Sequence, residues 1–129
     1  MPTVAEAMAV AELRVALRSF LRQSERAARS SGLTPQRYLL LLLIKGAADG
    51  SERSTVTDLA DRLHLAQSTV TELVARAEEA GLVKRNTADH DGRVALIRLT
   101  REGEHRLDRS FTALTEERRL LRAAIEGLA

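Results

Sequence analysis

The sequence predicts a mainly α-helical (α+β) protein of one domain, in which a compact lobe lies between two long helical ends. Three observations support this fold class. The 129 residues fit one domain of common size, and 44% hydrophobic and 29% charged content is ordinary for a globular fold. Residues 5–29 contain neither glycine nor proline. Two β-favouring runs, residues 82–85 and 94–99, lie close together in the second half of the chain.

The composition limits the classes of function. Because 20 basic residues oppose 18 acidic ones, the net charge is only +2, and the distribution of charge matters more than its total. The lack of cysteine excludes disulfides, thiolate metal sites and thiol redox sensing. No export signal is visible, and the longest apolar run, residues 39–44, is far shorter than the roughly 18 residues that a membrane span needs. We therefore expect a cytoplasmic protein without a membrane partner.

The first helix is expected over residues 5–29, which are rich in alanine, leucine, arginine and glutamate. Its apolar residues recur at roughly helical spacing: Met8, Ala11, Val15, Phe20 and Leu21, with Val10, Leu13 and Leu17 on the flank. Such a stripe requires a partner surface. Ser30, Ser31 and Gly32 then break the pattern.

A second helix is expected from Pro35 to about Gly46, because Thr34 can cap it and proline is favoured at the first helical position. Its apolar run, residues 39–44, could also form a buried strand. The threonine and proline at its start and Lys45 and Gly46 at its end favour a helix that is buried nearly all round. Residues 47–53 are expected to form a loop.

Two short helices separated by a tight turn are expected next. Thr57, with Asp58 just inside it, begins the first, which holds Leu59, Ala60 and Leu63 on one face. The second is expected over residues 67–80, with Gly81 just beyond its end and four apolar residues at core spacing: Val70, Leu73, Val74 and Ala77. Such a pair forms a helix-turn-helix, a pattern that other helical hairpins share.

A β-hairpin directly follows this pair. Its expected strands, residues 82–85 and 94–99, are joined by polar residues 86–93 with a turn at Asp91 and Gly92. A hairpin in this position is a wing, so the sequence predicts a winged helix-turn-helix with a two- or three-stranded β wing. Thr100 then caps a last helix through Leu107 to about residue 125, either single or kinked near Thr115.

The order of these elements resembles the MarR (multiple antibiotic resistance regulator) family over essentially the whole chain. Residues 57–63, TDLADRL, and 68–74, STVTELV, resemble the helix-turn-helix of that family. Residues 79–85, EAGLVKR, resemble its passage from recognition helix to wing. Asp91-Gly92-Arg93 and then Leu99-Thr100-Arg101-Glu102-Gly103 match the Asp-x-Arg wing motif and the Leu-Thr-x-x-Gly entry to the next helix.

The sequence departs from the family at two places. The family often has serine, commonly followed by proline, at the start of the recognition helix, where this chain has Ala66 and Gln67. Alanine cannot supply the capping oxygen, and Ser68 could help instead. After Thr100 the chain is also shorter than the two helices that usually close the dimer interface of the family.

The resemblance implies a homodimer that regulates transcription and binds a pseudo-palindromic operator in double-stranded DNA. It divides residues 1–129 into dimerisation helices, residues 1–32 and 101–129, and a DNA-binding lobe, residues 33–100. It further implies a ligand-responsive repressor, with a small-molecule effector bound near Arg37 and Tyr38. No cofactor is expected.

The recognition helix presents side chains that can read base edges in the major groove. The expected contacts come from Gln67, Ser68, Thr69 and Thr71. Gln67 suits an adenine edge, and the methyl groups of Thr69 and Thr71 suit thymine. Arg76, further along the helix, is expected to reach phosphate. An ordinary solvated helix face is the alternative for each of these residues.

The wing is expected to bind the minor groove through Arg93, with Asp91 orienting the guanidinium by a charge-assisted hydrogen bond. A plain exposed ion pair is the alternative. Lys84, Arg85 and Arg98 are expected to attract the phosphate backbone regardless of sequence.

Two functions other than DNA binding differ in the support that the sequence gives them. A winged-helix module that binds protein without touching DNA remains an alternative. Catalysis finds no support, because His64, His90 and His105 lack a metal spacing, and neither a phosphate loop nor a nucleophile motif is present. We therefore expect that the protein is not an enzyme.

Overall fold

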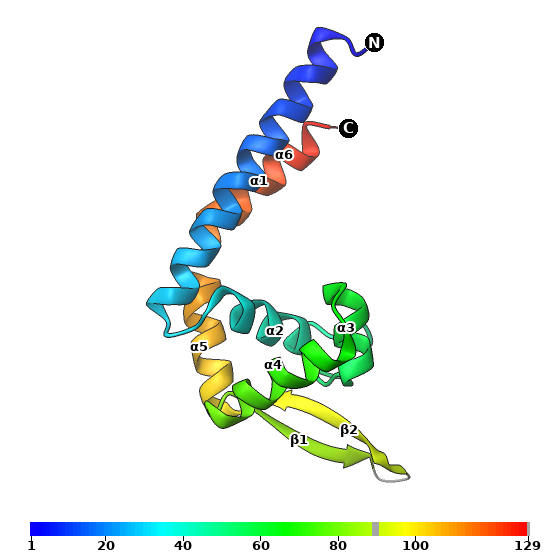
Figure 1. Ribbon diagram of the computed structural model, residues 1–129. Coiled ribbons are helices and arrows are strands. Elements are labelled where there is room, and N and C mark those ends of the chain that lie inside the picture. Colours follow the sequence, from blue (N-terminus) through cyan, green and yellow to red (C-terminus); the bar gives the residue numbers. More distant parts are fainter. Residues whose placement is uncertain (89–90, 129) are drawn as a thin grey trace.

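The computed structural model describes the backbone of residues 1–88 and 91–128, and their side chains except those of residues 87–88 and 91–93. Its elements are, in chain order, α1 (Val4–Ser30), α2 (Pro35–Lys45), α3 (Val56–Leu63), α4 (Gln67–Glu79), β1 (Val83–Ala88), β2 (Asp91–Leu99), α5 (Arg101–Thr112) and α6 (Thr115–Glu126). The predicted mainly α-helical winged fold is confirmed. Figure 1 shows α1 and α6 side by side in an elongated stem, whereas α2, α3, α4 and the hairpin form a lobe at its lower end.

Helix α1 begins and ends where local chemistry predicts. The Thr3 hydroxyl accepts a hydrogen bond from the Glu6 amide (3.1 Å), and the Glu6 carboxylate accepts one from the Thr3 amide (3.0 Å). This reciprocal pair is a capping box, which satisfies two amides that the first turn leaves without partners. The helix ends before Gly32, whose φ of 75° is left-handed and suits glycine.

Helix α2 is a helix and not a strand, and its cap is the predicted one. The Thr34 hydroxyl accepts a hydrogen bond from the Arg37 amide (3.1 Å), with proline as the first helical residue. Leu40, Leu41 and Ile44 are buried, but Leu39 remains 42% exposed. The prediction that α2 is buried on nearly all its faces is therefore wrong. The face with Leu39 borders a hollow between α1 and α2 that the described residues leave unfilled.

Helix α3 begins earlier than expected. Its N-cap is Thr55, whose hydroxyl accepts a hydrogen bond from the Asp58 amide (3.1 Å), so the prediction that Thr57 begins the helix is wrong. The cap is fixed by the preceding residue, because Ser54 pairs with Ile97 of β2 through two backbone hydrogen bonds of 3.0 and 2.8 Å. His64 ends the helix with a left-handed φ of 55°. This conformation makes the turn into α4 tight.

Helix α4 starts at Gln67, as expected, although its N-cap Ala66 provides no side-chain hydrogen bond and Ser68 does not replace it. Its end is a Schellman motif: the Gly81 amide donates to the Glu78 carbonyl (2.9 Å) and the Leu82 amide to the Ala77 carbonyl (2.9 Å). The φ of 76° at Gly81 makes this turn possible. The chain thus passes from α4 into β1 with its last carbonyls satisfied.

Strands β1 and β2 form an antiparallel sheet whose register runs from Val83 opposite Leu99 to Thr87 opposite Ala95, with a shift before Ala88 pairs with Asp91. The bridge from Ser54 to β2 adds a minimal third strand. The predicted turn at Asp91 and Gly92 is wrong, because both residues belong to β2 and Asp91 already pairs with Ala88. The connection therefore involves residues 89–90, which lie outside the described residues.

Two helices, α5 and α6, follow the wing, so of the two alternatives, a single last helix or a helix kinked near Thr115, the structure has the second. The predicted break near Thr115 is confirmed. Leu114 lies at this break and is 1% exposed. Its burial explains an interruption that neither glycine nor proline marks.

The stem meets the lobe through small side chains. Ala28 of α1 and Ser110 of α5 are entirely buried, and the Ser110 hydroxyl donates to the Ala27 carbonyl (3.4 Å). Nearby, the Arg106 guanidinium of α5 donates to the Gly32 carbonyl (3.1 Å). Helix α5 therefore joins stem and lobe. Within the described part of the chain, no helix has the length and apolar character needed to cross a membrane.

Candidate nucleic-acid interface

The exposed face of α4 carries the polar side chains that the sequence predicted there. Gln67, Ser68, Thr69 and Thr71 are all exposed. On the opposite side of the helix, three apolar side chains are entirely buried: Val70, Val74 and Ala77. Burial of one face therefore fixes the orientation of the helix and leaves the polar face to solvent.

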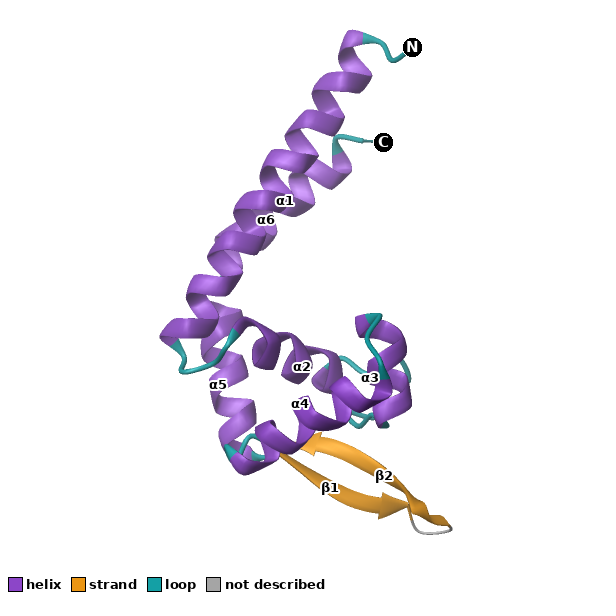
Figure 2. Ribbon diagram, viewed as in Figure 1, coloured by secondary structure: helices purple, strands orange, loops and turns teal. Residues whose placement is uncertain are grey.

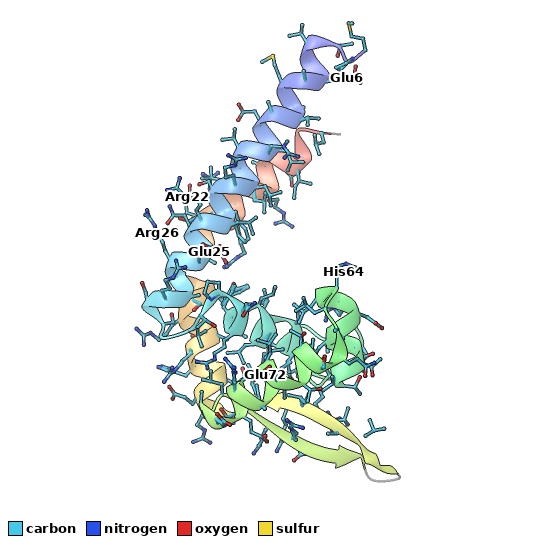
Figure 3. The ribbon with its side chains drawn as sticks, viewed as in Figure 1. Glu6, Arg22, Glu25, Arg26, His64 and Glu72 are labelled. Carbon is cyan, nitrogen blue, oxygen red and sulfur yellow. The ribbon has the colours of Figure 1, made fainter. Side chains whose placement is uncertain are left out.

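Arg76 has a partner that the sequence analysis missed. Its guanidinium lies 2.7 Å from the carboxylate of Glu72, one turn earlier, and both side chains are more than 60% exposed. Figure 3 labels Glu72 on α4. The spacing of four residues is the ordinary signal for such a helical ion pair. An acidic group therefore lies among the polar side chains of α4.

Two basic side chains face each other across the wing. The register places Lys84 of β1 opposite Arg98 of β2, and both are exposed. Like charges in this arrangement destabilise a sheet. Asn86 accepts a hydrogen bond from Arg98 Nε (3.2 Å) in the amide orientation that satisfies both of its polar atoms. Arg85, on the other face, lies 3.4 Å from Glu78 of α4. The wing thus concentrates positive charge on its outer face.

The end of the wing carries the remaining predicted residues. Asp91 and Arg93 belong to β2, but their side chains lie outside the described residues, as does His90. Figure 2 shows the hairpin projecting from the lobe at the end of the molecule away from the stem, with α4 packed beside it. The roles expected of Asp91 and Arg93 stay predictions.

Only one of the two residues expected at an effector site lines a hollow. Tyr38 is 7% exposed and lines a hollow of about 180 Å³ with Leu21, Ser24 and Leu39. Arg37 is half-buried and does not line it. Helices α1 and α2 supply the walls of this hollow.

The described histidines lie apart from one another. His64 is in the turn before α4 and His105 is in α5, and both are exposed. Among the side chains that the structure describes, no three histidine or acidic groups are arranged to hold a metal ion.

Comparison with protein families places the chain beside known regulators. Residues 31–94, which run from the end of α1 into β2, match the model of the MarR family. The organic hydroperoxide resistance transcriptional regulator of Bacillus subtilis (strain 168) is 35% identical over 71 residues, or 55% of this chain. The match spans 46% of that relative, so the chain aligns with less than half of its length.

Solved structures share the fold. A mutant of MarR from E. coli complexed with operator DNA superimposes with a TM-score of 0.67 and 19% identity, over 90% of this chain and 79% of that one. The M. tuberculosis transcriptional regulator MosR in complex with DNA gives a TM-score of 0.62 and 27% identity, over 85% of this chain and 77% of that one.

Proposed function

Because this chain belongs to the MarR family of transcriptional regulators, we propose that it binds double-stranded DNA in a sequence-specific manner as a homodimer. The observation that carries the proposal is the exposed face of α4, where Gln67, Ser68, Thr69 and Thr71 surround the start of a helix held by a fully buried opposite face. A helix of this kind fits the major groove with its first residues at the base edges. Regulators in this family are not enzymes, and no catalytic role is proposed.

In the proposed complex, α4 reads sequence and the wing supplies attraction. Gln67 makes two hydrogen bonds to an adenine, and the Thr71 methyl group touches thymine. Lys84 and Arg85 of β1 neutralise phosphates, as does Arg76 once it leaves Glu72. The structures of E. coli MarR with operator DNA and of M. tuberculosis MosR with DNA support this assignment, because the lobe of this chain has the same fold.

The wing tip completes the proposed contact. Arg93 enters the minor groove, where negative potential attracts a guanidinium, and Asp91 orients it. The spacing of these two residues in an Asp-x-Arg motif supports this assignment.

The proposed homodimer rests on apolar surface that one chain leaves uncovered. A groove of about 650 Å³ between α1 and α6 is lined by residues that include Val15, Phe20 and Leu120. Val15 is 67% exposed and Leu120 is 49% exposed. Such a patch marks an interaction site, and a second copy related by a two-fold axis covers it on both chains at once. Residues 1–32 and 101–129 then form the dimerisation part and residues 33–100 the DNA-binding part.

We also propose that the regulator is a repressor and that a small molecule weakens its binding to DNA. The hollow beside Tyr38 lies between the stem and the lobe, so a ligand there would contact both parts. The name of the Bacillus subtilis relative refers to organic hydroperoxide resistance. This chain has no cysteine, so any effector must act through binding and not through a thiol.

Selection of bound sites from a random duplex pool tests the proposal. The wild type should enrich a palindrome whose half-sites lie about one helical turn, or a multiple of it, apart. The Gln67→Ala/Thr71→Ala variant, which changes exposed residues only, should stay folded by circular dichroism and lose the enrichment. If the wild type enriches no sequence, the alternative of a winged-helix protein-interaction module is favoured.

A further inference from the structure

Helix α1 carries a row of arginines that the proposed operator contact does not use. Arg14, Arg18, Arg22 and Arg26 follow one another at intervals of four residues, and all are exposed. Successive members lie about 6 Å apart along the axis, so the row is about 18 Å long. We name these four residues the arginine ridge.

The arginine ridge runs along an exposed strip of α1 beside the groove against α6. Arg18 and Arg22 lie about 200° around the helix from Ala16 and Phe20 in that groove, but about 60° from Val15 and Ser19 at its edge. Figure 3 shows Arg22 and Arg26 projecting from the stem on the side away from α2, α3 and α4. The four side chains also border a hollow of about 470 Å³ along the helix.

The chain leaves this charge uncompensated, whereas it pairs arginines on other helices. Arg76, Arg106 and Arg119 each contact a glutamate three or four residues away, at 2.7, 2.8 and 2.6 Å. Within the described residues, no carboxylate oxygen lies within 4 Å of the arginine ridge.

The nearest sequence neighbours add to this charge. The residues four before and four after Arg18 and Arg22 are themselves arginines, and like charges at that spacing destabilise a helix. Glu25, the one acid at helical contact spacing from Arg22, lines both the hollow beside Tyr38 and a second hollow along α1 with Arg18 and Arg22, but in the described part of the chain it makes no ion pair with either arginine. An external anion would offset the repulsion.

We propose that the arginine ridge binds the phosphate backbone of a second DNA duplex, so that one molecule joins two duplexes. Guanidinium groups bind phosphate in a planar, two-point geometry, and the row contains no lysine. A duplex carries one charge per roughly 1.7 Å of its axis, counting both strands, so a length of about 18 Å carries about ten phosphates, part of which face the ridge. The lobe surfaces that we assign to the operator, α4 and the wing, lie below the stem (Figure 1), and Arg22 and Arg26 project from the stem (Figure 3), so the two duplexes would contact different parts of the molecule. This joining of two duplexes rests on the proposed function.

The test uses two double variants of the same charge. Arg18→Gln/Arg22→Gln removes two members of the ridge, and Arg119→Gln/Arg122→Gln removes two exposed arginines from α6 of the same stem. Each protein is bound to a duplex fixed on beads and then offered a fluorescent duplex of scrambled sequence. We expect the wild type and the α6 variant to retain the second duplex and the ridge variant to retain at least about ten-fold less. Equal retention by the ridge variant overturns the proposal, as does no retention by the wild type.

A second measurement separates the ridge from the lobe. In the Gln67→Ala/Lys84→Ala background, fluorescence anisotropy follows binding of the scrambled duplex between about 50 and 200 mM salt. Adding the two ridge substitutions should reduce the slope of log affinity against log salt by about 1.8, because each lost phosphate contact removes about 0.9. If the slope falls as expected, the ridge binds DNA even where the selection from a random duplex pool enriches no operator. If the slope does not change, the ridge proposal fails. A polyglutamate peptide is the control ligand. If the ridge binds this peptide but not the duplex, the surface is assigned to an acidic protein and the proposal of a second DNA duplex is overturned.

Discussion

Gly103, in the first turn of α5, lies so close to Leu82 that no side chain fits between them. A Cβ atom at Gly103 would lie 2.1 Å from the Leu82 carbonyl oxygen. The same oxygen accepts a hydrogen bond from the Thr100 amide (2.9 Å), and the Thr100 hydroxyl donates to the Gly81 carbonyl (2.6 Å) and accepts from the Gly103 amide (3.1 Å). The start of α5 is thereby fixed to the end of α4, which explains the glycine in the Leu-Thr-x-x-Gly sequence.

Replacing this glycine should damage the whole domain. Gly103→Ala should lower the free energy of unfolding by about 3 kcal/mol, because the backbone must shift to admit the methyl group. Urea denaturation followed by circular dichroism measures the change. The matched control is Gly127→Ala, whose Cβ would meet its nearest atom at 3.4 Å and should change stability by less than about 0.5 kcal/mol. Equal effects of the two substitutions would contradict the steric explanation.

Glu72 should weaken DNA binding in the wild-type protein. Glu72→Gln keeps the shape of the side chain, removes a negative charge from the exposed face of α4 and releases Arg76. We expect tighter binding to operator and scrambled duplex alike, and a salt slope steeper by about one, because Arg76 becomes free to neutralise a phosphate. Anisotropy titrations at several salt concentrations measure both. Glu116→Gln, which breaks a similar pair with Arg119 in the stem, should change neither. Weaker binding by Glu72→Gln would show that the pair positions Arg76 for DNA.

Arg93 and Lys84 should give different signatures. Arg93→Ala should weaken operator binding by about 1–3 kcal/mol and relax specificity at the base pairs near the wing. Lys84→Ala should weaken binding to every sequence and reduce the salt slope by about one, because it removes a phosphate contact. Titrations with operator and scrambled duplex separate the two. Equal losses on both duplexes for Arg93→Ala would assign that residue to phosphate.

Asp91 presents two opposing effects. Removing its negative charge should favour DNA, whereas losing the partner that orients Arg93 should weaken the specific complex. We expect Asp91→Ala to bind operator less tightly and scrambled duplex as tightly or more so, because an ordered arginine loses less side-chain entropy on binding. The measurement compares the mutant and the wild type at one salt concentration. Operator binding that stays equal or becomes stronger would show that Asp91 does not orient Arg93.

The proposed dimer depends on the apolar groove between α1 and α6. Light scattering at micromolar concentration should give about twice the chain mass of 14.2 kDa. Leu120→Glu places a charge in that groove and should give the monomer mass. Val94→Glu, at a similarly exposed apolar residue of the wing, should remain a dimer. A monomeric wild type that still binds a palindrome tightly would exclude the dimer.

Local chemistry made most helix boundaries predictable. Thr34 with Pro35, and Gly81 after α4, act through contacts within a few residues, and the structure has both ends where they were expected. The start of α3 was not predictable in this way, because Thr55 and Thr57 are both suitable caps. Pairing of Ser54 with β2, far along the chain, decides between them.

Long-range contacts account for the other differences. No glycine or proline marks the break before α6, and burial of Leu114 depends on the assembled helices. The polar face of α4 followed from helical periodicity alone. That Lys84 lies opposite Arg98 depends on the register of the two strands. The sequence alone does not specify this register.

The contact between Ala28 and the helix that carries Ser110 has a consequence for the divergence of related chains. Both side chains are small and entirely buried, and the Ser110 hydroxyl reaches the Ala27 carbonyl of α1 at 3.4 Å, so the two helices pack closely here. One added methyl group at either position would tilt the long arm of the molecule relative to its winged end, and a small tilt becomes a large displacement at the far tip.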